Sequence, residues 1–105
     1  MSINAYKPKE IKSLSRIFKI LGEPNRLKIL TSLGLECRPV SAIVASTGLT
    51  QTNVSFHLRV LREAGLVKAE KNGSFVFYCL PEPELRVIID HFQYWNSSST
   101  STKKN

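Results

Sequence analysis

The 105-residue chain is poor in the residues on which most catalytic chemistry depends. It contains two cysteines, two histidines and one aspartate, and it has no glycine-rich phosphate loop and no nucleophile motif. A general acid, a base and a nucleophile could hardly be assembled from this set. The sequence therefore argues against an enzyme.

Long apolar runs are missing as well. Nowhere do about eighteen apolar residues follow one another, so no membrane span is expected. The N-terminal residues lack the apolar segment and cleavage site of a signal peptide. We expect a soluble cytoplasmic protein without a membrane partner.

The two cysteines, Cys37 and Cys79, lie far apart and form no CxxC motif. In a reducing compartment, a structural disulfide between them is not expected. One interpretation is that each is a small buried hydrophobic residue. The other is that they meet in the fold or across a dimer and act as a dithiol redox or persulfide switch, since cations such as Arg38 activate a nearby thiolate.

What the chain does have is enough apolar material for one small core, because 42% of its residues are hydrophobic. We expect one domain over residues 9–95, preceded by a flexible segment at 1–8. The polar run NSSSTSTKKN at 96–105 cannot build a core and is expected to be a disordered tail.

Positive charge dominates the chain. The formal net charge is +7 and the sequence pI is about 9.7, which favours contact with nucleic acid or with an anionic membrane surface. Residues 1–28 hold seven lysines and arginines against two glutamates, whereas 81–95 hold one arginine against three acidic residues. The last segment is therefore the one least suited to DNA.

Hydrophobic spacing predicts a mainly α-helical fold with a small β-hairpin. Apolar residues recur at three- and four-residue steps over 9–21, 24–33 and 85–95, which indicates one helix in each segment. Pro24 suits the first turn of the second of these helices, because its missing N–H would have been unpaired there.

Two further helices and a hairpin lie between them. A short helix is expected after Ser41 as its N-cap and before Gly48, and a longer one is expected from Thr50 to a stop at Gly65. The runs LVKAE and SFVFYCL then flank Asn72-Gly73, a strong hairpin signal because both residue types tolerate positive φ. The predicted order is α-α-α-α-β-β-α, that of a winged helix-turn-helix.

The helix after Thr50 has the features that best indicate a function. It follows a tight glycine turn, it places Val54, Leu58 and Leu61 on an inward stripe, and it opens with short polar side chains. These are features of a helix-turn-helix whose second helix enters the major groove, where amides and hydroxyls reach base edges. Two arginines farther along would bind phosphates, and the hairpin would act as a wing on the neighbouring backbone or minor groove.

The candidate DNA contacts lie on this helix and on the hairpin. They are Thr50, Gln51, Thr52, Asn53, Ser55, Phe56, His57, Arg59, Arg62, Lys68, Lys71, Asn72 and Ser74. The alternative is a capped amphipathic helix with a solvated polar face. The combination of glycine turn, polar helix start, spaced arginines and hairpin favours the DNA interpretation.

Three segments resemble the ArsR/SmtB family of winged helix-turn-helix repressors. LGEPNRLKIL at 21–30 is similar to the family's second helix, TQTNVSFHLRVLREAGLV at 50–67 to its recognition helix and following turn, and KNGSFVFYCL at 71–80 to its wing. With the flanking helices, the resemblance covers nearly all of residues 9–95. It implies a homodimer that binds a pseudo-palindromic DNA operator and leaves it when an inducer binds.

The apolar stripes of the first and last helices agree with dimerisation, because they carry more large residues than so small a domain can cover. The alternative is that these stripes complete the core of the monomer. The expected dimer contacts are Ile11, Leu14, Phe18, Leu85, Ile88, Ile89, Phe92 and Trp95.

The metal sites that the resemblance implies are broken in this sequence. Cys37 is alone where paired thiolates are used, and Asp90 and His91 are adjacent, so their side chains diverge by about 100° around the helix. No metal site or cofactor is therefore assigned, although a metal or metalloid inducer fits the family. His57 is expected in helix packing or on a phosphate, and His91 on the surface or at an interface.

The sequence therefore predicts a homodimeric repressor, released from its operator by an inducer or by modification of Cys37 and Cys79. Two alternatives remain: a winged-helix module that contacts protein, and a constitutive DNA-binding protein without a sensing site.

Overall fold

The computed structural model describes the backbone of residues 4–103 and the side chains of residues 4–98. Its helices are α1 (Pro8–Leu21), α2 (Pro24–Leu33), α3 (Val40–Thr47), α4 (Gln51–Glu63) and α5 (Glu84–Lys103), and its strands are β1 (Arg38–Pro39), β2 (Lys68–Asn72) and β3 (Phe75–Cys79). This is the predicted order of elements with one strand added. Within residues 4–103, no helix combines the length and the apolarity needed to cross a membrane.

Polar side chains and proline set the helix starts. Glu23 accepts a hydrogen bond from the backbone N–H of Arg26 at 3.1 Å, and Pro24 takes the first position of α2, as expected. Thr50 accepts one from the backbone N–H of Asn53 at 3.1 Å and so caps α4. Gly48 ends α3 with φ 75°, a left-handed conformation that glycine adopts without steric cost.

The core lies where α2, α3 and α4 meet. Its fully buried residues are Ile29, Leu30, Leu33, Ile43, Val54, Leu58, Leu61 and Val67. The inward stripe predicted for α4 is therefore confirmed. Leu85 and Ile89 of α5 pack partly against this cluster, so these two expected dimer contacts are shared with the core of their own chain.

The sheet has three antiparallel strands in the order β1-β3-β2. The segment LECRP was expected to be a loop, but Arg38 pairs with Tyr78 and Pro39 with Phe77. A proline is tolerated there because β1 is an edge strand, where the missing N–H removes no ladder hydrogen bond on the open side. α3 accordingly begins at Val40, one residue before the expected cap Ser41.

The hairpin turn differs by one residue from the expected one. Asn72 pairs with Phe75, so the two-residue loop is Gly73-Ser74, and the positive φ of 66° lies at Gly73. Glycine at the first loop position is the pattern of a type II′ turn, whereas an Asn-Gly loop would form type I′.

The last helix is longer than expected. It continues to Lys103 instead of ending near Trp95, and the amide of Gln93 donates to the Ser97 hydroxyl at 3.2 Å along it. Once a helix has formed, each further residue needs only one more backbone hydrogen bond, so Ser and Thr can extend it. The expected disordered tail is therefore helical over 96–103, and residues 104–105 lie outside the described residues.

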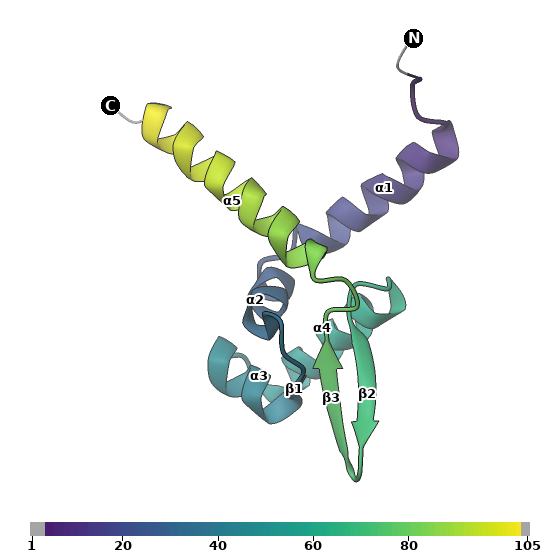
Figure 1. Ribbon diagram of the computed structural model, residues 1–105, viewed down its shortest axis with the longest axis vertical. Helices are drawn as coiled ribbons and strands as arrows, with labels where there is room; N and C mark the ends of the chain where they lie inside the picture. The colour runs from purple at the N-terminus through teal and green to yellow at the C-terminus, as the bar shows by residue number, and fades with distance from the viewer. Residues whose placement is uncertain (1–3, 104–105) are drawn as a thin grey trace.

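The elements give the molecule a forked shape of 53 × 40 × 22 Å. α1 and α5 project from one side of the helical body and diverge, while the β2–β3 hairpin projects from the opposite side (Figure 1). The expected flexible segment at 1–8 gives way to helix at Pro8, and residues 1–3 lie outside the described residues. The turn of the wing thus points away from the two long helices.

Candidate nucleic-acid interface

α4 has one buried face and one open face. Val54, Leu58 and Leu61 are at most 1% exposed, whereas the polar residues of its first turn and both arginines are exposed. The exposed candidates on or beside the helix are Thr50, Gln51, Thr52, Asn53, Ser55, Phe56, Arg59 and Arg62. The structure therefore places this set at the surface.

The first-turn side chains have no competing partner. Within the described residues, Gln51, Thr52, Asn53 and Ser55 use no side-chain atom in a hydrogen bond. The hydroxyls of Thr31, Ser32 and Thr47, by contrast, bond back to carbonyls of their own helices, that of Thr47 to the Ile43 carbonyl at 2.7 Å. The donors and acceptors of α4 are therefore available to an external ligand.

Successive residues of a helix turn by about 100°, which orders these side chains around α4. Thr52 and Arg59 lie at the centre of the open face, with Ser55 and Arg62 on one flank. Asn53 lies on the other flank. Both arginines therefore stand beside the same polar surface, and Phe56, which is 49% exposed, adds an apolar side chain near its centre.

His57 does not belong to this surface. It is 7% exposed, and its Nδ1 accepts a hydrogen bond from Nε of Arg26 at 3.3 Å. It stands three residues after Val54 and therefore shares the buried stripe. Its burial and its hydrogen bond to Arg26 favour the expected role in helix packing over a DNA contact.

Arg26 is a structural residue that sequence reasoning missed. Its guanidinium also donates from Nη1 to the Ile20 carbonyl at 3.3 Å, so it joins the end of α1, the start of α2 and α4. Arg86 connects α5 to α2, because it donates to the Thr31 carbonyl at 2.9 Å. It also donates to Asp90 of its own helix at 3.0 Å. Their partners His57 and Thr31 lie 31 and 55 residues away in the sequence, so no short-range pattern predicts these hydrogen bonds.

The wing presents its polar tip to solvent. Lys71, Asn72 and Ser74 are exposed around the turn. Lys68 lies at the base of the wing, opposite Cys79, where its Nζ pairs with Glu70 at 3.0 Å. Its charge is therefore partly neutralised, and Lys71 is the wing cation best placed to approach a phosphate.

Cys37 and Cys79 form a disulfide across β1 and β3. The expectation that they form no structural disulfide is wrong. Arg38 stands opposite Tyr78 in the antiparallel pairing of β1 with β3, so the next position along brings Cys37 opposite Cys79. The expectation that they meet in the fold is confirmed. Cys79 is 4% exposed and faces inward, whereas Cys37 is exposed, and neither carries a free thiol in this structure.

Comparisons with known proteins agree with this geometry. The model of the family described as bacterial regulatory protein, arsR family, matches residues 23–69. MJ1325, an uncharacterised HTH-type transcriptional regulator of Methanocaldococcus jannaschii, is 38% identical over 78 residues, which make up 71% of this chain and 85% of that protein.

Two solved structures share the whole fold. The crystal structure of Rv0081 from Mycobacterium tuberculosis has a TM-score of 0.85 and 29% identity, with 95% of this chain and 100% of that chain covered. The homodimeric winged helix-turn-helix DNA-binding domain of Mb0332 from Mycobacterium bovis has a TM-score of 0.80 and 24% identity, and the match covers 98% of each chain. At 24% identity, the likeness to Mb0332 supports the fold alone.

The exposed polar face of α4, the wing and these relatives point to one class of protein, and that class binds DNA and is not an enzyme. The chain belongs to the arsR family of winged helix-turn-helix transcriptional regulators.

Proposed function

We propose that this regulator is a homodimeric repressor, which binds a pseudo-palindromic operator through α4 and the wing. Release follows modification of the Cys37–Cys79 pair or binding of an inducer. The observation that carries the proposal is the open face of α4, whose first-turn side chains have no hydrogen-bond partner within the described residues.

The chemistry of this face suits double-stranded DNA. Amide and hydroxyl groups read base edges in the major groove, and arginines beside them bind phosphates. Gln51, Thr52 and Ser55 would supply the first kind of contact, and Arg59 and Arg62 the second. With a formal charge of +7 on the chain, binding should fall steeply as salt rises.

The dimer is supported by the apolar surface shared by α1 and α5. Every side chain of α1 is at least partly exposed, although Ile11, Leu14 and Phe18 are large apolar residues, between 40% and 53% exposed. On α5, Ile88, Phe92 and Trp95 are between 50% and 67% exposed. An apolar surface of this kind on a small domain indicates a partner.

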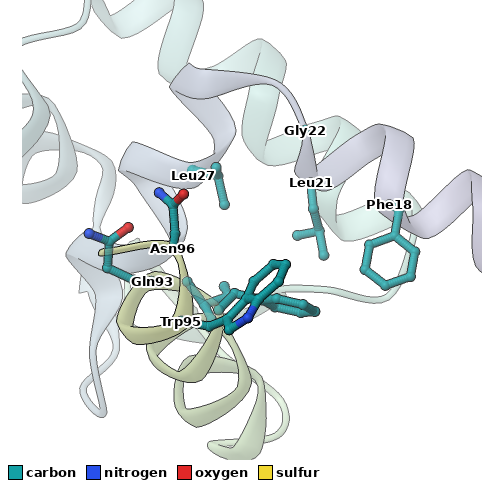
Figure 2. A pocket seen from close by; sticks show the side chains of 9 residues that line it. Phe18, Leu21, Gly22, Leu27, Gln93, Trp95 and Asn96 are labelled. Carbon is teal, nitrogen blue, oxygen red and sulfur yellow. The ribbon is translucent and has the colours of Figure 1, made fainter. Parts of the chain in front are cut away.

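A hollow of about 400 Å³ lies between these helices. Figure 2 shows Phe18, Leu21 and Trp95 lining it, with the polar Gln93 and Asn96 at its margin. The Phe18 and Phe92 rings meet edge to face at 6.3 Å beside it. A second copy of the chain is the occupant that we propose, because two-fold pairing here would leave both α4 helices free for half-sites one helical turn apart.

Thiol chemistry can act on DNA binding through the sheet. The disulfide joins Cys37, the residue before β1 and α3, to the last residue of β3 in the wing. Exchange with a low-molecular-weight thiol would break the S–S bond, reduce Cys37 and Cys79 to thiols and oxidise two thiol molecules to a disulfide. The wing would then be held to the helix-turn-helix by backbone pairing with β1 and by the packing of Tyr78 and Leu80 against the core.

The test is a fluorescence-anisotropy titration with DNA from immediately upstream of the gene, in reduced and oxidised protein and over several salt concentrations. We expect specific, salt-dependent binding that differs between the two redox states. Arg59→Ala should weaken binding to every DNA sequence. It should also reduce the slope of log affinity against log salt concentration by about one.

Arg16→Ala provides the matched control, since Arg16 is an exposed arginine of α1 outside the proposed surface. Equal losses in both variants would contradict the assigned face. Absence of specific binding in both redox states would instead favour the protein-contact alternative. Binding that ignores the redox state would leave the repressor and overturn the thiol switch.

A further inference from the structure

The base of the wing gathers three metal-ligating side chains. Cys37 directly precedes β1, Cys79 ends the central strand β3, and Glu70 lies in the middle of β2. Glu70 pairs with Phe77, two residues before Cys79, so the two side chains are diagonal neighbours on one face of the sheet. One ligand atom from each of the three residues lies within 4.8 Å of the others.

Two sulfurs and a carboxylate oxygen form a donor set for a thiophilic divalent cation. Zinc and similar ions bind thiolates at about 2.3 Å and carboxylate oxygens at about 2.0–2.2 Å. In a tetrahedral site, donors at such distances lie roughly 3.5–3.8 Å apart, so the two sulfurs must separate after reduction and Glu70 must approach by up to about 1 Å. A rotamer change of an exposed glutamate can supply that movement.

We propose that, when the disulfide is reduced, Cys37, Cys79 and Glu70 bind one thiophilic divalent cation such as Zn²⁺ or Cd²⁺. The disulfide and the metal are thus alternative states of the same base of the wing. This inference does not depend on the proposed repressor function, because it concerns the free protein.

The surroundings supply the fourth ligand and the charge balance. A cavity of about 110 Å³ adjoins both cysteines and is also lined by Lys68, Leu80 and Pro83, which leaves room for a water ligand. Two thiolates and one carboxylate around a divalent cation leave one negative charge. The Lys68 ammonium, 3.0 Å from Glu70, offsets it and orients the carboxylate.

Reduction of the disulfide and binding of the metal are two separate steps. A dithiol reductant gives two electrons and two protons to the S–S bond, which yields two cysteine thiols and one oxidised reductant. The metal then displaces the two thiol protons to solvent as it binds both sulfurs. Loading should therefore release two protons for each metal ion bound.

The test uses Co²⁺ as a spectroscopic probe for the full-length protein, kept reduced by a phosphine. We expect one Co²⁺ per chain, with thiolate charge-transfer absorption and the visible bands of a tetrahedral site, and displacement by Zn²⁺. Oxidised protein should show neither band. Failure of the reduced protein to bind either ion would overturn the proposal.

Variants identify the ligands. Cys37→Ser, at an exposed position that should tolerate the change, should lose most of the charge-transfer absorption. Glu70→Gln should weaken binding at least tenfold, since loss of a ligand should cost at least as much as loss of its orienting partner. Unchanged affinity in either variant would contradict the site.

Glu36→Gln is the matched control. Its carboxylate is next to Cys37 in sequence but lies 3.9 Å from the Arg38 guanidinium and outside the cluster. We expect wild-type Co²⁺ affinity for this variant. A loss with Glu36→Gln and none with Glu70→Gln would replace the assigned carboxylate and overturn the proposal as stated. These measurements need no DNA, so their failure is distinct from failure of the proposed repressor.

Discussion

Two exposed residues of α4, Gln51 and Arg59, present different chemical groups to a ligand. Gln51 presents an amide that can donate and accept in one plane, while Arg59 presents a charge. Both are exposed, and neither uses its side chain in a hydrogen bond within the described residues. The proposed division is that Gln51 reads a base and Arg59 holds a phosphate.

Gln51→Ala should therefore reduce discrimination at one base position by about 1–3 kcal/mol and leave the salt slope unchanged. The measurement is competition binding against operators that differ at single base pairs. Arg59→Ala is the comparison, because it should weaken binding to all of these operators alike. Uniform loss with Gln51→Ala would show that the amide does not read a base.

His57 and Arg26 should be coupled in stability. His57→Ala leaves the partly buried Arg26 Nε without its acceptor, so we expect a loss of about 2 kcal/mol in the free energy of unfolding. A double-mutant cycle with Arg26→Met should give a coupling of at least about 0.5 kcal/mol, measured by urea unfolding. Arg59→Ala, on the exposed face, should stay within about 0.5 kcal/mol of wild type. Additive losses from the two changes would contradict the bridge.

At the scale of elements, the disulfide is a covalent cross-link between the wing and the segment that leads into α3. It closes a loop with a sequence separation of 42, which in the chain-entropy description stabilises the native state by about 4 kcal/mol. Cys37→Ser should therefore unfold at lower urea concentration than oxidised wild type. Reduced wild type is the control and should resemble the variant. Equal midpoints for oxidised and reduced protein would contradict this role.

Local signals predicted most elements, because their causes are local. Thr50, Pro24 and Gly48 act through neighbours within four residues, and the structure uses each of them as expected. β1 was missed because a two-residue strand with a proline has no pattern of its own and forms only by pairing with β3. The extra turns of α5 were missed because propagation from a formed helix outweighs weak Ser and Thr propensity.

Local sequence likewise predicts some parts of the candidate site and not others. The exposed polar face of α4 follows from helix periodicity and could be predicted. Burial of His57 also follows from that periodicity, because it stands three residues after Val54 at the edge of the inward stripe. The meeting of Cys37, Cys79 and Glu70 depends on the register of three strands, which no local spacing contains.

At the scale of the whole molecule, α1 and α5 diverge from the body with large apolar side chains uncovered (Figure 1). Phe92→Glu would bring a charge into the surface that we propose for the second copy. We expect a dimer in wild type and a monomer in this variant by sedimentation equilibrium, with operator affinity reduced as well.

Phe75→Glu is the matched control for this change, because Phe75 is 65% exposed on the wing, away from α1 and α5. It should remain dimeric. A monomeric wild type, or a dimer in Phe92→Glu as strong as in wild type, would contradict the proposed pairing.

The most direct test of the whole account is an NMR titration of isotope-labelled protein with its operator DNA. We expect the amide signals of residues 50–62 and 71–74 to change together, while those of the α1–α5 surface change little. Changes confined to α1 or α5, with α4 unaffected, would contradict the claim that this regulator reads DNA through the open face of α4.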